Sequence, residues 1–87
     1  MELIDQFAHI ATGAVYDDLT PELIAARVDA VHATNTYNAS YGHSRDERER
    51  LLREVVGSMG SDVNFEPTFR CEFGRNIHLG SRFFANF

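Results

Sequence analysis

The chain of 87 residues contains no lysine, a single cysteine and no long apolar run. All of its 8 basic side chains are therefore arginines, and 13 acidic side chains outnumber them, which gives a net charge of −5. A nucleic-acid-binding protein needs surplus cations to displace the counterions of phosphate, so the composition argues against that class. It argues equally against attachment to an anionic membrane surface.

The single cysteine, Cys71, excludes an intrachain disulfide, a CxxC pair and a thiolate cluster for zinc. His9, His32 and His43 share no spacing with one another or with carboxylates that would bring metal ligands together. We therefore expect no metal site. Cys71 stands in an alternating segment, which is typical of a small buried apolar side chain; a reactive thiol is the alternative.

No apolar segment approaches the roughly 20 residues that a membrane-spanning helix requires. Glu2 and Asp5 stand where a secretory signal would carry cations. These features predict a soluble, cytoplasmic protein. The length supports one compact domain at most, with a small core.

Two apolar patterns at helical spacing occupy the first 40 or so residues. The first predicts a helix over about residues 2–12, with Gln6 off its apolar stripe. The second begins at Thr20-Pro21-Glu22, which combines an N-cap hydroxyl, a proline at the first helical position and an acid near the positive helix end. We expect this helix to fray before Asn38. Its predicted buried seam is Ile24, Val28 and Val31, flanked by Leu23, Ala26, Ala30 and Ala33.

A third helix is predicted from Ser44, because Ser44 and Glu47 have the spacing of a capping box. Asp46–Arg50 and Glu49–Arg53 are acid-before-base pairs four residues apart, each worth a few tenths of a kcal/mol. The charges from Arg45 to Arg53 balance, which is typical of a solvated helix face. Gly57 and Gly60 offer stops, and the predicted buried face consists of Leu51, Leu52, Val55, Val56 and Met59.

After Gly60 the spacing of apolar residues becomes strand-like. Residues 63–66 and 69–73 each alternate apolar and polar side chains, which predicts short strands. From Phe73 onward the period is six, with an aliphatic residue before a glycine, which is typical of a parallel β-helix. Chance periodicity in a β segment is the alternative. The six-residue spacing relates Phe73, Leu79 and Ala85; Gly74, Gly80 and Asn86; and Ile77 and Phe83.

Stacked repeats need at least about three units to be stable, and here the repeat stops within a unit. We therefore expect further coils beyond residues 83–87, and an apolar edge through which the isolated chain associates. The predicted fold is a mainly α N-terminal domain of three helices, residues 1–60, followed by residues 61–87 as short strands that begin a β-helix.

Several of these segments together resemble the front of bacterial galactoside or maltose O-acetyltransferases. The similarity covers essentially the whole chain and is most specific from Gly74 to Phe87. The segments that carry it are Ala11–Asp18, Pro21–Arg27, Asn38, Arg48–Glu54, Glu66-Pro67 and Phe73–Phe87.

The resemblance implies a helical maltose-acetyltransferase domain followed by a left-handed hexapeptide-repeat β-helix. It implies acetyl transfer from acetyl-CoA to a sugar hydroxyl, in a homotrimer with active sites between subunits. The family's histidine base and its CoA contacts fall on later coils, so this chain is expected to bind no cofactor and to be inactive alone. Acetyl-CoA is then a co-substrate of the full-length family.

The resemblance also assigns three acceptor-binding residues. Asp18 matches an acidic residue that follows the first helix and would hydrogen-bond a sugar hydroxyl. Glu72 matches a position that is usually serine or aspartate. Asn86 matches an asparagine beside the acceptor hydroxyl, where a neutral amide could donate to the developing oxyanion as a supporting catalytic group.

Each assignment has a structural alternative. Asp18 also fits a solvated turn pair with Asp17, and Asn86 also fits a β-helix corner in the left-handed backbone conformation. His78 belongs to the strand motif and is expected to be structural, not the general base. For the chain as a whole, the alternative to an acetyltransferase segment is a non-catalytic helical module that binds other chains through its β end.

Overall fold

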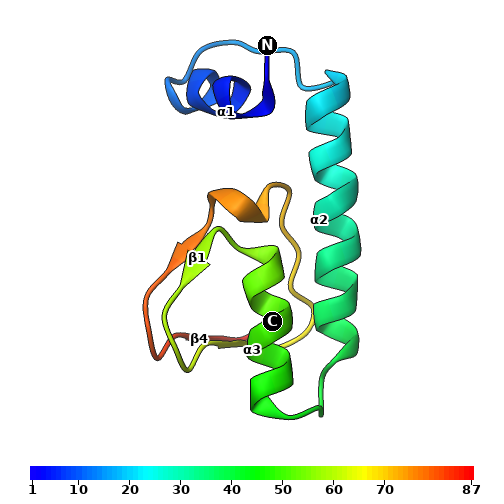
Figure 1. Ribbon diagram of the computed structural model, residues 1–87, viewed down its shortest axis with the longest axis vertical. Helices are drawn as coiled ribbons and strands as arrows, with labels where there is room; N and C mark the ends of the chain where they lie inside the picture. Colours follow the sequence, from blue (N-terminus) through cyan, green and yellow to red (C-terminus); the bar gives the residue numbers. More distant parts are fainter.

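A computed structural model describes residues 1–87 as a mainly helical chain that ends in short strands. In Figure 1, α2 runs along one side of the molecule, α1 lies across its N-terminal end, and α3 and the strands lie beside its C-terminal half. No helix is both long and apolar enough to cross a bilayer. The elements are α1 (Leu3–Ala11), α2 (Pro21–Ala39), α3 (Arg45–Val55), β1 (Ser58–Met59), β2 (Asn64–Phe65), the 3₁₀ turn η1 (Gly74–Asn76), β3 (His78–Leu79) and β4 (Phe84–Ala85).

The bounds of α1 agree with the predicted helix, but its predicted apolar stripe is only partly buried. The one buried residue of α1 is Gln6, while Ile4 is largely exposed. Gln6 Nε2 donates to Glu22 Oε1 at 2.9 Å, and Thr20 Oγ1 donates to Gln6 Oε1 at 2.6 Å. The side-chain amide therefore joins α1 to the start of α2 through satisfied polar contacts.

The start of α2 confirms the predicted cap, because Thr20 Oγ1 accepts from Leu23 N at 3.2 Å and Pro21 is the first helical residue. The predicted seam is wrong. Ile24, Val28 and Val31 are 45%, 48% and 53% exposed. A different stripe of α2, which includes two alanines, faces the rest of the fold. That buried stripe consists of Leu23, Ala26, Ala30, Thr34 and Tyr37.

The predicted fraying of α2 is also wrong, since the helix continues to Ala39. The polar side chains of Thr34 and Asn38 form hydrogen bonds that leave the backbone hydrogen bonds of the helix intact. Thr34 Oγ1 donates to Ala30 O at 2.8 Å within the helix. Asn38 Nδ2 donates to Phe69 O and Asn38 Oδ1 accepts from Phe69 N, both at 2.9 Å. Tertiary contacts therefore override the low helix propensity of this segment.

Helix α3 confirms the predicted start, with Ser44 Oγ accepting from Glu47 N at 3.2 Å. The two predicted i,i+4 ion pairs do not form. Arg50 pairs with Glu47 and Glu54 instead, and Arg53 donates to the carbonyls of residues 59 and 60. Leu51, Leu52, Val55 and Val56 are buried as predicted, and Met59 lies in β1, where it is partly buried against the core. The core cluster consists of Tyr37, Leu51, Leu52, Val55, Val56 and Val63.

The strands form two separate parallel pairs, β1 with β3 and β2 with β4. Partners lie 20 residues apart, as in Ser58↔His78 and Asn64↔Phe84. Strand β2 starts six residues after β1, at 64 and 58, and β4 starts six residues after β3, at 84 and 78. The six-residue period predicted for β3 and β4 is thus present, and β1 was not predicted.

The strand predicted over residues 69–73 is wrong. This segment is irregular and leads into η1. The backbone N–H and C=O of Phe69 are both bound by the Asn38 side chain, so they are not available for a strand ladder.

Candidate functional site

Two of the three residues predicted to bind an acceptor meet at one arginine. Arg27 Nε, on α2, donates to Glu72 Oε2 at 2.9 Å. Its Nη1 donates to the carbonyl oxygen of Asp18, and its Nη2 lies 3.4 Å from Asp18 Oδ2. Asp18 comes from the loop between α1 and α2, and Glu72 from the irregular segment before η1. One guanidinium therefore joins α2 to the loop just before it and to a segment 45 residues later.

Aromatic rings hold the guanidinium in place. Arg27 Cζ lies 5.2 Å from the centroid of the Phe73 ring, a cation–π distance. Phe73 in turn packs edge-on against Phe7 of α1, with ring centroids 5.2 Å apart. The Arg27 side chain is 23% exposed, whereas those of Asp18 and Glu72 are each 59% exposed. The cation is fixed against the fold while both carboxylates face outward.

A groove of about 630 Å³ lies beside Arg27 and Glu72, and Cys71 is one of the residues that line it. Burial raises the pKa of the Cys71 thiol, so this side chain stays protonated at neutral pH. The protonated thiol fits the predicted role of Cys71 as an apolar side chain, not that of a nucleophile. The groove is lined by Arg27, Val31, Thr34, Asn35, Thr68, Arg70, Cys71 and Glu72.

Asn86, the third predicted residue, does not join the cluster. It is exposed and directly follows β4, which pairs with β2. In Figure 1 the C-terminus lies well away from the loop between α1 and α2. Asp18 and Glu72 are thus brought together within one chain, and Asn86 is placed elsewhere.

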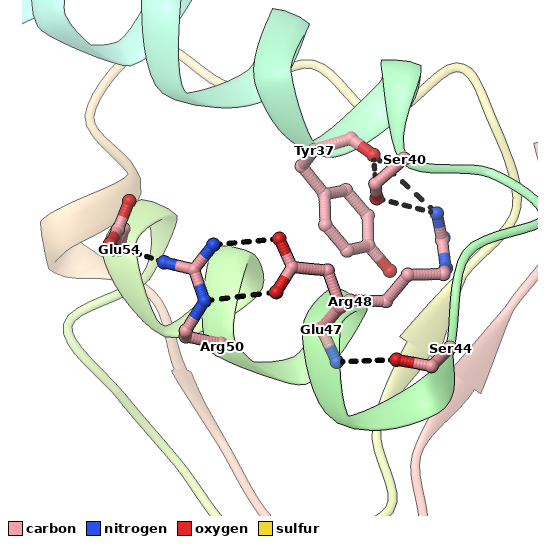
Figure 2. A network of polar contacts seen from close by, with 7 residues as sticks. All are labelled: Tyr37, Ser40, Ser44, Glu47, Arg48, Arg50 and Glu54. Atoms are coloured by element: carbon pink, nitrogen blue, oxygen red, sulfur yellow. Dashed lines mark hydrogen bonds and ion pairs between the residues drawn. The ribbon is translucent and has the colours of Figure 1, made fainter.

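Another arginine, Arg48, is buried, contrary to the prediction of a solvated face from Arg45 to Arg53. Arg48 is 7% exposed and stacks on Tyr37, with its Cζ 4.4 Å from the ring centroid. Figure 2 shows its Nη1 reaching Ser40 Oγ at 3.0 Å and Tyr37 O at 3.4 Å. Its Nη2 donates to Phe65 O at 2.9 Å. A spacing signal was present, because Arg48 lies three and seven residues before the buried Leu51 and Val55.

These contacts tie the C-terminal end of α2 to β2. The hydrogen-bond partners of Arg48 are neutral oxygen atoms, and only one of them, the carbonyl of Tyr37, belongs to the end of α2. By contrast Arg50, also drawn in Figure 2, is exposed and bound to Glu47 and Glu54 on the surface of α3. Its hydrogen bond lowers the pKa of Glu47.

His78 also contacts a side chain of the neighbouring strand. Its Nδ1 lies 2.8 Å from Ser58 Oγ, across the β1–β3 pair. Both side chains are exposed. The contact is consistent with the structural role predicted for His78. No three His, Cys, Asp or Glu side chains gather in a group that could hold a metal ion.

Residues 10–60, more than half of the chain, match the family described as the maltose acetyltransferase hexapeptide capping motif. The chain belongs to this family. The match includes Asp18 and Arg27 and ends before Glu72 and Asn86.

Individual relatives agree with the family. The chain is similar to galactoside O-acetyltransferase of Escherichia coli (strain K12), with 30% identity over 90% of this chain and 38% of that protein. It is similar to nodulation protein L of Rhizobium meliloti (strain 1021), with 32% identity over 86% of this chain and 41% of that protein. A Dictyostelium discoideum protein, provisionally named an acetyltransferase, is 36% identical over 86% of this chain and 38% of its own. The chain thus spans about two fifths of the length of these relatives.

Proposed function

We propose that this chain is the N-terminal part of an acetyl-CoA-dependent sugar O-acetyltransferase of the galactoside or maltose type, and that it supplies contacts to the acceptor sugar. Membership of the capping-motif family carries the proposal. The name of the Escherichia coli relative supports acetyl transfer to a galactoside. The convergence of Asp18 and Glu72 on Arg27 supports a role in acceptor binding.

The proposal includes a left-handed β-helix that continues beyond residue 87. The parallel register of β1 with β3 and β2 with β4, at six-residue spacing, supports it. The proposal also divides the chain into a helical part, residues 1–60, and a β part, residues 61–87. Strand β1 lies in the first part and pairs with β3 in the second. Each exposed strand edge would then pair with the next coil.

In the proposed reaction, the acceptor hydroxyl oxygen attacks the thioester carbonyl carbon of acetyl-CoA. The hydroxyl proton passes to a histidine base on a later coil and then to the departing CoA sulfur. Asp18 and Glu72 would accept hydrogen bonds from other sugar hydroxyls and so orient the acceptor. Asn86 would donate its amide N–H to the oxyanion that develops on the carbonyl oxygen.

Asn86 follows β4, which pairs with β2, and it does not line the groove that contains Arg27 and Glu72. This separation supports an active site shared between subunits of a homotrimer. Asn86 of one subunit would then face the carboxylates of a neighbour. This arrangement would explain how three acceptor-binding residues serve one sugar although they do not meet within a chain.

One feature favours the alternative, a non-catalytic module that associates through its β end. The apolar side chains of Phe84 and Phe87 are largely exposed at that end. The reading frame distinguishes the two functions. Further hexapeptide repeats in this frame support the acetyltransferase, and a stop after Phe87 with no neighbouring frame of repeats supports the module.

The proposed function is tested with two proteins, the 87-residue chain and a form extended by the residues that follow it in its gene. Release of CoA thiol is measured with acetyl-CoA and a panel of galactosides, maltose and glucose. We expect sugar-dependent release by the extended form only. Specific thioester cleavage by the 87-residue chain would contradict placing the base on later coils. Absence of release with every sugar would contradict acetyl transfer.

A further inference from the structure

We propose that Arg27 is the positioning residue of the acceptor site, which holds Asp18 and Glu72 so that one uncharged sugar meets both carboxylates. This inference rests on the proposed function. It concerns a residue that no spacing motif singled out and that acts through the carboxylates it binds.

The geometry shows how one side chain can control two. The guanidinium presents its donors in a rigid plane, so binding Glu72 through Nε at 2.9 Å fixes the direction in which Nη1 and Nη2 meet Asp18. Stacking on Phe73 limits rotation of that plane. The relative placement of the two carboxylates is therefore set by Arg27.

The carboxylates keep free acceptor capacity. Arg27 takes Glu72 Oε2 and faces Asp18 Oδ2, while Glu72 Oε1 and Asp18 Oδ1 accept no hydrogen bond from the protein. Both side chains are more than half exposed. Each can therefore accept a sugar hydroxyl without leaving Arg27. Arg27 Nη2 itself has no hydrogen-bond partner, so its contact with Asp18 is an ion pair that can tighten.

The length of Glu72 fits this role. The resemblance expects serine or aspartate at this position, and neither is as long. Aspartate would be shorter by one carbon–carbon bond, about 1.5 Å, which would take the carboxylate out of hydrogen-bond reach of Arg27 Nε unless the backbone moved. The glutamate and Arg27 therefore work as a pair.

The charges define the class of acceptor. Asp18 and Glu72 carry two negative charges, and Arg27 and Arg70, which both line the groove, carry two positive charges. The site therefore has no net charge, and its free carboxylate oxygens suit an uncharged polyhydroxyl acceptor that donates hydrogen bonds. Removing Arg27 would leave Asp18 and Glu72 without the cation that holds them.

The test compares Arg27→Met and Arg27→Lys in the extended protein with Arg50→Met as the matched control. Arg50 also lies between two carboxylates, but on the surface of α3. We expect Arg27→Met to raise the acceptor KM about tenfold, with kcat and the acetyl-CoA KM within about twofold. Arg27→Lys should recover part of this loss, because it keeps the charge without the fork. Arg50→Met should change none of these constants. An acceptor KM within about twofold of wild type in Arg27→Met would overturn the proposal.

A binding readout separates this proposal from acetyl transfer itself. Galactoside is titrated into labelled extended protein without acetyl-CoA, and the side-chain carboxyl NMR signals of Asp18 and Glu72 are followed. Joint shifts at both carboxylates that are lost in folded Arg27→Met support Arg27, even if no sugar is acetylated. Normal acetylation with unchanged shifts in Arg27→Met would uphold the proposed function and overturn the role of Arg27. Circular dichroism confirms that each variant is folded.

Discussion

Arg48 Nη2 donates to the backbone carbonyl of Phe65 at 2.9 Å, so a buried cation on α3 holds strand β2. The same guanidinium binds the C-terminal end of α2 through Ser40 and Tyr37. Because β2 pairs with β4, and Asn86 follows β4, Arg48 also supports the backbone next to the proposed oxyanion residue. The contact of Arg48 with Phe65 thus links helix α3 to the β2–β4 pair.

Arg48→Ala is expected to lower the free energy of unfolding by about 3 kcal/mol, since it leaves buried carbonyls without donors. That loss is a large share of the stability of a small domain. Urea unfolding followed by circular dichroism measures it. Arg45→Ala is the control, because Arg45 is exposed and pairs with Asp62 at the surface; it should cost at most about 1 kcal/mol. Equal losses in the two variants would show that Arg48 is not the buried link described here.

Gly74→Ala is expected to destabilise the fold by about 1–3 kcal/mol, because an added Cβ would lie closer than 3.0 Å to the carbonyl oxygen of Val55. Gly80→Ala serves as the matched control, since its Cβ would meet nothing within 4 Å. Thermal unfolding of both variants gives the comparison. A Gly74→Ala variant as stable as Gly80→Ala would contradict the close approach of η1 to the end of α3.

The two faces of α2 can be distinguished by stability. Leu23→Ala removes a fully buried side chain and should cost about 2–5 kcal/mol. Val28→Ala, on the exposed stripe, should change stability by no more than about 0.5 kcal/mol. Chemical unfolding of the 87-residue chain measures both. The reverse order would restore the seam of Ile24, Val28 and Val31 as the buried face.

The apolar β end is expected to make the isolated chain associate. Phe84 and Phe87 are largely exposed beside unpaired strand edges. Sedimentation should show oligomers of the wild-type chain that dissociate in the double variant Phe84→Asp, Phe87→Asp. A wild-type chain that stays monomeric at high concentration would count against this end as an association surface.

Local signals were sufficient to predict the helices and their starts. Each N-cap involves two residues three positions apart, Thr20 with Leu23 and Ser44 with Glu47. Both caps are present in the structure. The face of α2 could not be decided in this way, because two stripes of the same helix have helical spacing. Tertiary packing selected the one with small residues and Tyr37, and left the β-branched stripe outside.

Long-range features could not be derived from local patterns. Strand β1 is two residues long and is defined by partners 20 positions later. In the sequence, Arg27 has the features of an ordinary helical arginine. Only the fold brings it into contact with Asp18, which precedes it, and Glu72, which follows it. The resemblance named those two carboxylates as binding residues, but it did not indicate what would hold them together.

Steady-state kinetics of Asp18→Asn, Glu72→Gln and Asn86→Ala in the extended protein test the central claim most directly. The first two substitutions should raise the KM for the acceptor sugar and leave the KM for acetyl-CoA unchanged, because they weaken only sugar contacts. Asn86→Ala should lower kcat by about 100-fold through loss of an oxyanion donor. Wild-type constants in all three variants would contradict the assignment of the acceptor side to this chain.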